Sequence, residues 1–209
     1  MKKSILAVLI AVSIAVSYVG IVINSKTPAI ADCDAENIVV SETAESTSPV
    51  ISLTYTAFNT PNIDSSFKTY MDYRTITNKE SNQYKLIQSY GWGDENGFMR
   101  TSGEKDLGIA EDYYMIALGS YYGKHIGTKY KITTDTGKIF YGILSDQKAD
   151  KDTNSTKQYS IYNNDVIEFI VDVKRLNKNV KIMGSANVYM PLNGKITKIE
   201  RIDFLKEGS

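Results

Sequence analysis

The sequence has little of the chemistry that most catalytic and metal sites use. Its 209 residues include one cysteine, Cys33, and one histidine, His125. A single cysteine excludes an intramolecular disulfide and a cysteine-rich metal site, and a histidine-based zinc site would lack ligands. The sequence also has no GxxxxGK[ST] loop to bind phosphate. We therefore expect no metal, nucleotide or other cofactor.

An excess of charge of either sign is also lacking, because 24 Lys and Arg residues balance 24 Asp and Glu residues. Nucleic-acid-binding domains usually carry a basic patch or stripe, so we expect no nucleic-acid partner. Tyrosine, in contrast, is abundant, with 15 residues. Tyr favours strands and also lines polymer-binding clefts, because its side chain joins an apolar face to a hydroxyl.

The first 31 residues have the pattern of an export signal or an N-terminal membrane anchor. Two lysines precede an unbroken run of apolar and small residues at 5–23. This run is long for a signal peptide and close to the roughly 20 residues of a membrane-spanning helix. The A-x-A pattern at 29–31 is a possible cleavage site. Both interpretations place the rest of the chain outside the cytoplasmic membrane, secreted or anchored at the cell envelope.

The remainder divides into a linker and a folded domain. Residues 32–66 are rich in Ser, Thr, Glu, Asn and Pro, and we expect a flexible linker there. Aromatic residues become dense from Phe67, so we place the folded domain at 67–206. Periodicity leaves open whether residues 67–84 form a short helix or an irregular lead-in.

Short strand-like runs recur through this domain, separated by Gly, Asn or Asp. We expect strands at 86–90, 113–118, 129–133, 138–144, 166–173, 187–190 and 195–204. Short, regularly spaced strands are typical of a sandwich or a small barrel and argue against a parallel α/β sheet. The sequence therefore predicts an all-β domain.

The stretch from Asp135 to Thr153 sets acidic residues at fixed steps around two glycines. Asp135-Thr136-Gly137 predicts a turn, because Asp can bond its own backbone and Gly accepts a positive φ. Gly142 interrupts a β run and indicates a bulge or a close backbone approach. Asp146 follows the apolar run directly, where a strand leaving the core would carry a carboxylate to a rim or cleft. The alternative interpretation of this charged stretch is a solvated loop.

The spacing of these residues carries a resemblance to a known family. Gly127-Thr128-x-Tyr130-x-Ile132, followed by Asp135-Thr136-Gly137-x4-Gly142-x3-Asp146, resembles the three-aspartate domain of bacterial cell-wall proteins. That domain is similar to the double-psi β-barrel of membrane-bound lytic transglycosylase A and of expansins. Residues 67–203 also look like uncharacterised exported or phage-associated domains of low-GC Gram-positive bacteria. The resemblance implies a six-stranded double-psi β-barrel with short helical or irregular additions.

The same resemblance implies a function and two site residues. Asp146 would be the acid/base that cleaves the glycan strand of peptidoglycan, as in a lytic transglycosylase, and Asp135 would be the turn aspartate that supports it. The family's first aspartate falls at Gly119 in this sequence. The alternative function is a non-catalytic module on the same barrel that binds cell-wall glycan or scaffolds an envelope complex.

Several other residues are candidates for binding the substrate. Tyr121 and Tyr122 would stack on sugar rings, unless they pack in the core or at its rim. His125 would transfer protons, unless it is an ordinary loop histidine. Lys148 and Asp152 flank Asp146 at close range and would tune its pKa, or simply neutralise a loop.

Glu168 and Asp172 bracket the apolar triplet Phe169-Ile170-Val171. Strand alternation places both acidic residues on one face together with Ile170. We expect that face to lie at a solvent-exposed edge.

Overall fold

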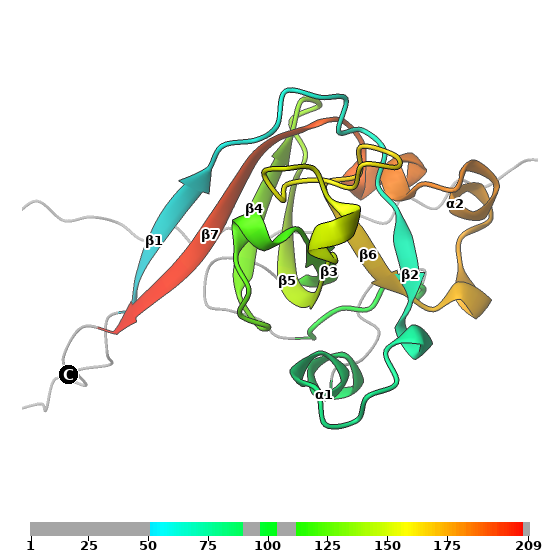
Figure 1. Cartoon of the computed structure of the whole chain (residues 1–209), viewed down its shortest axis with the longest axis horizontal. Coiled ribbons are helices and arrows are strands. Elements are labelled where there is room, and N and C mark those ends of the chain that lie inside the picture. Colours follow the sequence, from blue (N-terminus) through cyan, green and yellow to red (C-terminus); the bar gives the residue numbers. More distant parts are fainter. Residues whose placement is uncertain (1–50, 90–96, 104–111, 207–209) are drawn as a thin grey trace, which may run out of the picture. The chain divides into compact units, whose positions relative to one another are not determined.

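Seven strands form one mixed sheet in the described residues, which are 51–89, 97–103 and 112–206 of a computed structural model (Figure 1). The strands are β1 (Ile51–Phe58), β2 (Tyr70–Asp72), β3 (Tyr114–Leu118), β4 (Lys129–Thr134), β5 (Ile139–Gln147), β6 (Glu168–Val171) and β7 (Ile196–Lys206). The helices are α1 (Asn82–Ser89) and α2 (Lys178–Met183). The 3-10 helices are η1 (Tyr73–Thr75), η2 (Ser120–Tyr122), η3 (Asp150–Asp152), η4 (Val173–Arg175), η5 (Ala186–Val188) and η6 (Met190–Leu192).

The strand order is β1-β7-β4-β5-β3-β6-β2. Neighbouring strands pair antiparallel except for β3 with β5 and β2 with β6, which are parallel. The predicted β class is therefore confirmed, because the described residues are mostly β with two short helices. Among these residues no pairing joins the end strands β1 and β2, so strand pairing does not close the sheet into a barrel.

Strand β1 lies inside the stretch that was predicted to be a linker. Its residues pair antiparallel with β7 from Ile51, opposite Lys206, to Phe58, opposite Ile199. The β-branched and aromatic residues of ISLTYTAF favour a strand. The linker was predicted from the average composition of residues 32–66, in which the Ser and Thr residues outweigh this short segment. The linker prediction is thus wrong for residues 51–58. Residues 1–50, which include the predicted signal or anchor, lie outside the described residues.

Two predicted strands are helical instead. Residues 86–89 belong to α1, where the Tyr84 amide donates to the Ser81 hydroxyl at the helix start and Ile87 is buried. Residues 187–190 fall in η5 and η6, and the Ser185 hydroxyl accepts from the Asn187 amide at the start of η5. Both predictions are wrong because a short apolar run does not distinguish a buried strand from one face of a short helix.

Buried side chains cover both faces of the central strand β3. Ile116 and Leu118 pack with Leu144 and Phe169 on one face, whereas Met115 packs with Ile143 and Ile170 on the other. This arrangement follows the alternation of side chains along a strand. Among the described residues no helix is long and apolar enough to cross a membrane.

Candidate functional site

A β-bulge in β5 determines where Asp146 points. Ile116 of β3 pairs with Leu144, but the next residue, Ala117, pairs with Asp146, so Ser145 is an extra residue in β5. Without the bulge, Asp146 would share the face of Leu144, two residues away. The extra residue turns Asp146 to the opposite face, the face of Ala117 and Met115. The predicted exit of a carboxylate from the core therefore depends on this bulge.

Glu168 lies on the same sheet face, one strand beyond Ala117. Ala117 pairs with Asp146 of β5 on one side and with Glu168 of β6 on the other. Strand spacing places the Cα atoms of the two acidic residues roughly 10 Å apart. The small Ala117 side chain lies between the two acidic residues and is itself buried. Sequence alternation placed Glu168 correctly beside Ile170, but the expected solvent-exposed edge is wrong, because Glu168 is only partly exposed.

Lys148 follows β5 and forms a buried ion pair beside the two carboxyl groups. Its Nζ lies 2.8 Å from an oxygen of Asp165 and 3.9 Å from an oxygen of Glu168. The Lys148 and Asp165 side chains are 6% and 1% exposed. The Thr69 hydroxyl also donates to Asp165. Lys148 therefore lies beside Glu168, and Asp165 is its closest partner.

Burial makes both carboxyl groups weaker acids than usual. Loss of solvent raises the pKa of Asp146, and the Gln147 amide and the Lys148 charge only partly oppose this effect. Burial also raises the pKa of Glu168; Lys148 opposes this, whereas Asp165 and Asp146 add to it. The geometry therefore provides two half-buried carboxyl groups that can hold a proton at higher pH than an exposed carboxyl group.

A cavity of about 190 Å³ adjoins this cluster. Its lining includes Lys148 and Glu168 from the cluster, with Thr69, Ala149, Asp152, Ser160, Asn163 and Asp165. Asp152 also accepts a hydrogen bond from the Tyr162 hydroxyl over 3.3 Å. Of the predicted residues, Lys148 and Asp152 line this cavity, and Asp146 is not among its lining residues.

Asp135 lies far from Asp146. It occupies the turn before β5, where its carboxylate accepts from the Lys195 amide over 2.8 Å. Gly137 in this turn has a φ of +77°, so the predicted turn is present. The seven residue steps from Ile139 to Asp146 span roughly 23 Å of strand. Asp135 therefore does not support Asp146 directly, and that expectation from the resemblance is wrong for this chain.

Two glycines of the motif have steric reasons for being glycine. At Gly142 a Cβ would clash with the Ile116 side chain in the core, which confirms the predicted close approach. At Gly119 a Cβ would clash with the backbone carbonyl of Lys157. Gly119 directly follows β3, so the place of the family's first aspartate has no room for a carboxylate in this fold.

The aromatic and histidine candidates do not join the cluster as one set. Tyr122 is fully buried and packs edge-to-face against Phe58, so its alternative interpretation as a core residue holds. Tyr121 is exposed and contacts the rings of Phe58 and Tyr122 edge-to-face. His125 is also exposed, and its backbone carbonyl accepts from Thr128. Of these three, Tyr121 and His125 remain accessible to a ligand.

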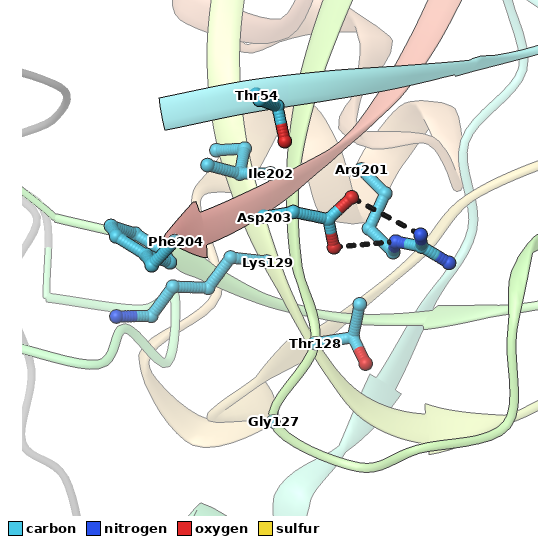
Figure 2. Close-up of a pocket in the computed structure, with 8 residues that line it drawn as sticks. All are labelled: Thr54, Gly127, Thr128, Lys129, Arg201, Ile202, Asp203 and Phe204. Carbon is cyan, nitrogen blue, oxygen red and sulfur yellow. Dashed lines mark hydrogen bonds and ion pairs between the residues drawn. The ribbon is translucent and has the colours of Figure 1, made fainter. Parts of the chain in front are cut away.

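A larger hollow of about 810 Å³ lies elsewhere, between β1, β7 and the start of β4 (Figure 2). The Gly127-Thr128 pair of the motif lines it, together with Thr54, Lys129 and residues 201–204. Its carboxylate, Asp203, is bound by Arg201 over 2.8 Å. The hydrogen bonds from Arg201 hold the pKa of Asp203 below its usual range. This hollow therefore has no carboxyl group suited to donating a proton, whereas Glu168, whose pKa is raised, lines the smaller cavity.

Within the described ranges, no group of three or more His, Cys, Asp or Glu side chains is arranged to hold a metal ion. A comparison of the chain with protein-family models, curated proteins and solved structures returned no match. The candidate site therefore depends on its geometry alone. Asp146, Lys148 and Asp152 were predicted from the sequence, whereas Asp165 and Thr69 were not. The sequence placed Glu168 on one face with Ile170, but no local pattern connects it with Asp146.

Proposed function

We propose that this chain is an exported enzyme that cleaves the glycan strand of peptidoglycan, as lytic transglycosylases do. The observation that carries the proposal is the pairing of Asp146 and Glu168 across Ala117, with the pKa of both carboxyl groups raised by burial. Glycan cleavage needs a carboxylic acid to protonate the leaving oxygen, and a raised pKa keeps that proton available. Export, expected from residues 1–31, would bring this site to the wall.

Asp146 would act first as an acid and then as a base. In its protonated form it donates to the glycosidic oxygen as the bond to the anomeric carbon breaks. The resulting carboxylate then removes the proton from the muramyl 6-hydroxyl, whose oxygen attacks the anomeric carbon and closes an anhydro ring. Glu168, as a carboxylate on the other side of Ala117, would stabilise the positive charge that develops on the sugar. This cycle consumes no cofactor.

Lys148 has a supporting part in this mechanism. Asp165 largely neutralises the charge of Lys148, because Asp165 lies closer to the Lys148 Nζ than Glu168 does. An unpaired lysine beside Asp146 would lower the pKa of the acid more strongly. The pairing with Asp165 would therefore limit how far Lys148 lowers the pKa of Asp146, and it ties the end of β5 to the segment that precedes β6.

We also propose that strands β2 to β7 form the six-stranded double-psi β-barrel that the resemblance implies, with β1 as an extension. The support is the pair of parallel neighbours, β3 with β5 and β2 with β6, within an otherwise antiparallel sheet. Further support comes from residues 97–103, where Met99 bridges to Val171 and Thr101 bridges to Tyr114. These bridges connect β3 and β6 where the two strands diverge.

A second function is favoured by two observations. The place of the family's first aspartate is closed by the Lys157 carbonyl, and Asp135 lies at the far end of β5. A barrel without these partners could bind wall glycan without cutting it, or scaffold an envelope complex. In that case Tyr121 and His125, which are exposed, would be the contact residues.

Incubation of the purified protein with bacterial sacculi distinguishes these functions. The enzyme should release anhydro-muropeptides, Asp146→Asn should strongly reduce their release, and Asp135→Asn should leave it intact. Release by Asp146→Asn at the wild-type rate would contradict the assignment of the acid. Co-sedimentation with sacculi without product would favour the glycan-binding module, and absence of both would favour a protein partner.

A further inference from the structure

A cationic and apolar surface lies on the segment that follows β6, outside the candidate site. Residues 173–192 contain four cationic residues and no acidic one, in a chain whose total charge is zero: Lys174, Arg175, Lys178 and Lys181. Lys178 and Lys181 lie on α2, are exposed, and take part in no ion pair with another described residue. Within the described part of the chain, the charges of Lys178 and Lys181 are therefore not paired with an acidic side chain.

Large apolar side chains are exposed on the same segment. Ile182 and Met183 of α2 are 68% and 61% exposed, and Met190 of η6 is 66% exposed. Val188 of η5 is also exposed. Helix α2 packs against η5, and η5 packs against η6, so these side chains belong to neighbouring elements. A cluster of such residues on a soluble domain usually marks an interaction surface.

The elements that carry this surface are anchored to the core. Val180 of α2, Ala186 of η5 and Leu192 of η6 are buried in the same apolar cluster. The Ala186 amide donates to the Lys68 carbonyl over 2.8 Å, and the buried Lys68 ammonium donates to the Asn187 side chain over 3.0 Å. The backbone that carries the exposed side chains is therefore fixed in place, and it does not need to become ordered on binding.

We propose that the α2 surface, formed by Lys178, Lys181, Ile182, Met183, Val188 and Met190, docks on an anionic lipid bilayer. Apolar side chains flanked by lysines are the chemistry of an interfacial membrane contact: the apolar groups enter the headgroup boundary and the lysines attract anionic lipids. This contact would hold the domain against the membrane surface, whether or not residues 1–31 are cleaved.

Two other occupants fit the surface less well. A soluble polyanion would use the lysines but would leave Ile182, Met183 and Met190 in water. A second copy that docked through the same surface would place Lys178 and Lys181 near their own counterparts, and like charges repel. Of these three occupants, the anionic bilayer is the one that uses both the charge and the apolar area.

The two exposed methionines provide a local measurement of docking. Full-length protein is mixed with saturated phosphatidylglycerol–phosphatidylcholine vesicles or with phosphatidylcholine alone, and methionine oxidation by peroxide is followed by mass spectrometry. Residues 5–23 would insert into both kinds of vesicle, so the N-terminal segment attaches the protein equally to both and does not account for a difference between them. We expect anionic vesicles to slow oxidation of Met183 and Met190 about fivefold, because oxidation follows exposure of the sulfur. Met99 and Met115 are fully buried and serve as internal references.

Matched variants test the role of charge. Lys178→Gln with Lys181→Gln should restore fast oxidation in anionic vesicles, whereas Lys124→Gln with Lys138→Gln, at exposed sites elsewhere, should not. Equal slowing by neutral vesicles would overturn the proposal. Slowing in concentrated protein without lipid would show a second copy as the occupant, and equal slowing by soluble polyphosphate would show a polyanion. Either result would replace the bilayer.

Discussion

The two ends of β5 carry the two aspartates of one sequence motif, and their surroundings differ sharply. Asp135, in the exposed turn before the strand, accepts a backbone hydrogen bond from Lys195. Asp146, near the other end, is half-buried on a sheet face with Glu168, and burial raises its pKa. The comparison shows that two aspartates at the spacing of one family motif do not need to have the same role. The bulge at Ser145 and the neighbouring strands make one carboxyl group a candidate acid, while the other stabilises a turn.

The largest expected effect is on activity. Asp146→Asn should lower the rate of anhydro-muropeptide release by about 10²–10⁴-fold, because it removes the general acid. Asp135→Asn keeps the turn geometry and should keep nearly the full rate. Rates on purified sacculi, with a thermal melt of each variant to confirm folding, measure the contrast. Equal losses in the two variants would mean that the ends of β5 act as one site.

The buried ion pair beside Asp146 should have the largest effect on stability. Lys148→Met leaves Asp165 as an uncompensated charge at a position only 1% exposed, which costs about 3–5 kcal/mol in the free energy of unfolding. Lys151→Met, at an exposed site in η3, should change it by less than about 0.5 kcal/mol. Urea unfolding gives both values. A small loss for Lys148→Met would show that the cluster is solvated, and would weaken its difference from the Asp135 turn.

The pH dependence of stability should also separate the two regions. Burial raises the pKa of Asp146 and of Glu168, so the folded state holds these protons more tightly than the unfolded chain does. Their contribution to stability is therefore greatest below about pH 4, the usual carboxyl pKa, and falls as pH rises through the raised pKa values.

Urea unfolding at several pH values measures this contribution as a difference. Relative to wild type, Asp146→Asn with Glu168→Gln should gain stability as pH increases from about 4 to 7. Asp135→Asn should follow the wild-type trend. A double variant that also follows the wild-type trend would show that the two carboxyl groups are not desolvated.

The smallest expected effect is at the turn itself. Asp135→Ala removes the acceptor of the Lys195 amide and should cost about 1 kcal/mol or less, because that amide lies near the surface and can bond to water. The rate of product release should not change. A thermal melt and the sacculus assay check both parts, and a loss of activity without a loss of stability would restore Asp135 to the site.

The sequence by itself determined those elements whose pattern is local. Strand β4 was predicted as a short strand-like run at 129–133, and in the structure Tyr130 and Ile132 are buried between partly exposed neighbours. The turn at Asp135 and the close approach at Gly142 were likewise readable from single residues. Strand β1 and helix α1 were missed, because composition averages and short apolar runs carry no information about the partner against which a segment packs.

The tertiary structure alone decided the site. Asp146 and Glu168 are 22 residues apart in the sequence and meet only because β3 lies between β5 and β6. The bulge at Ser145 is a mismatch between two strands, so neither strand reveals it separately. Burial then raises the pKa values, and burial is a sum over many non-local contacts. Local pattern determined which segments form strands; the pairing of distant strands determined which carboxyl groups share a face.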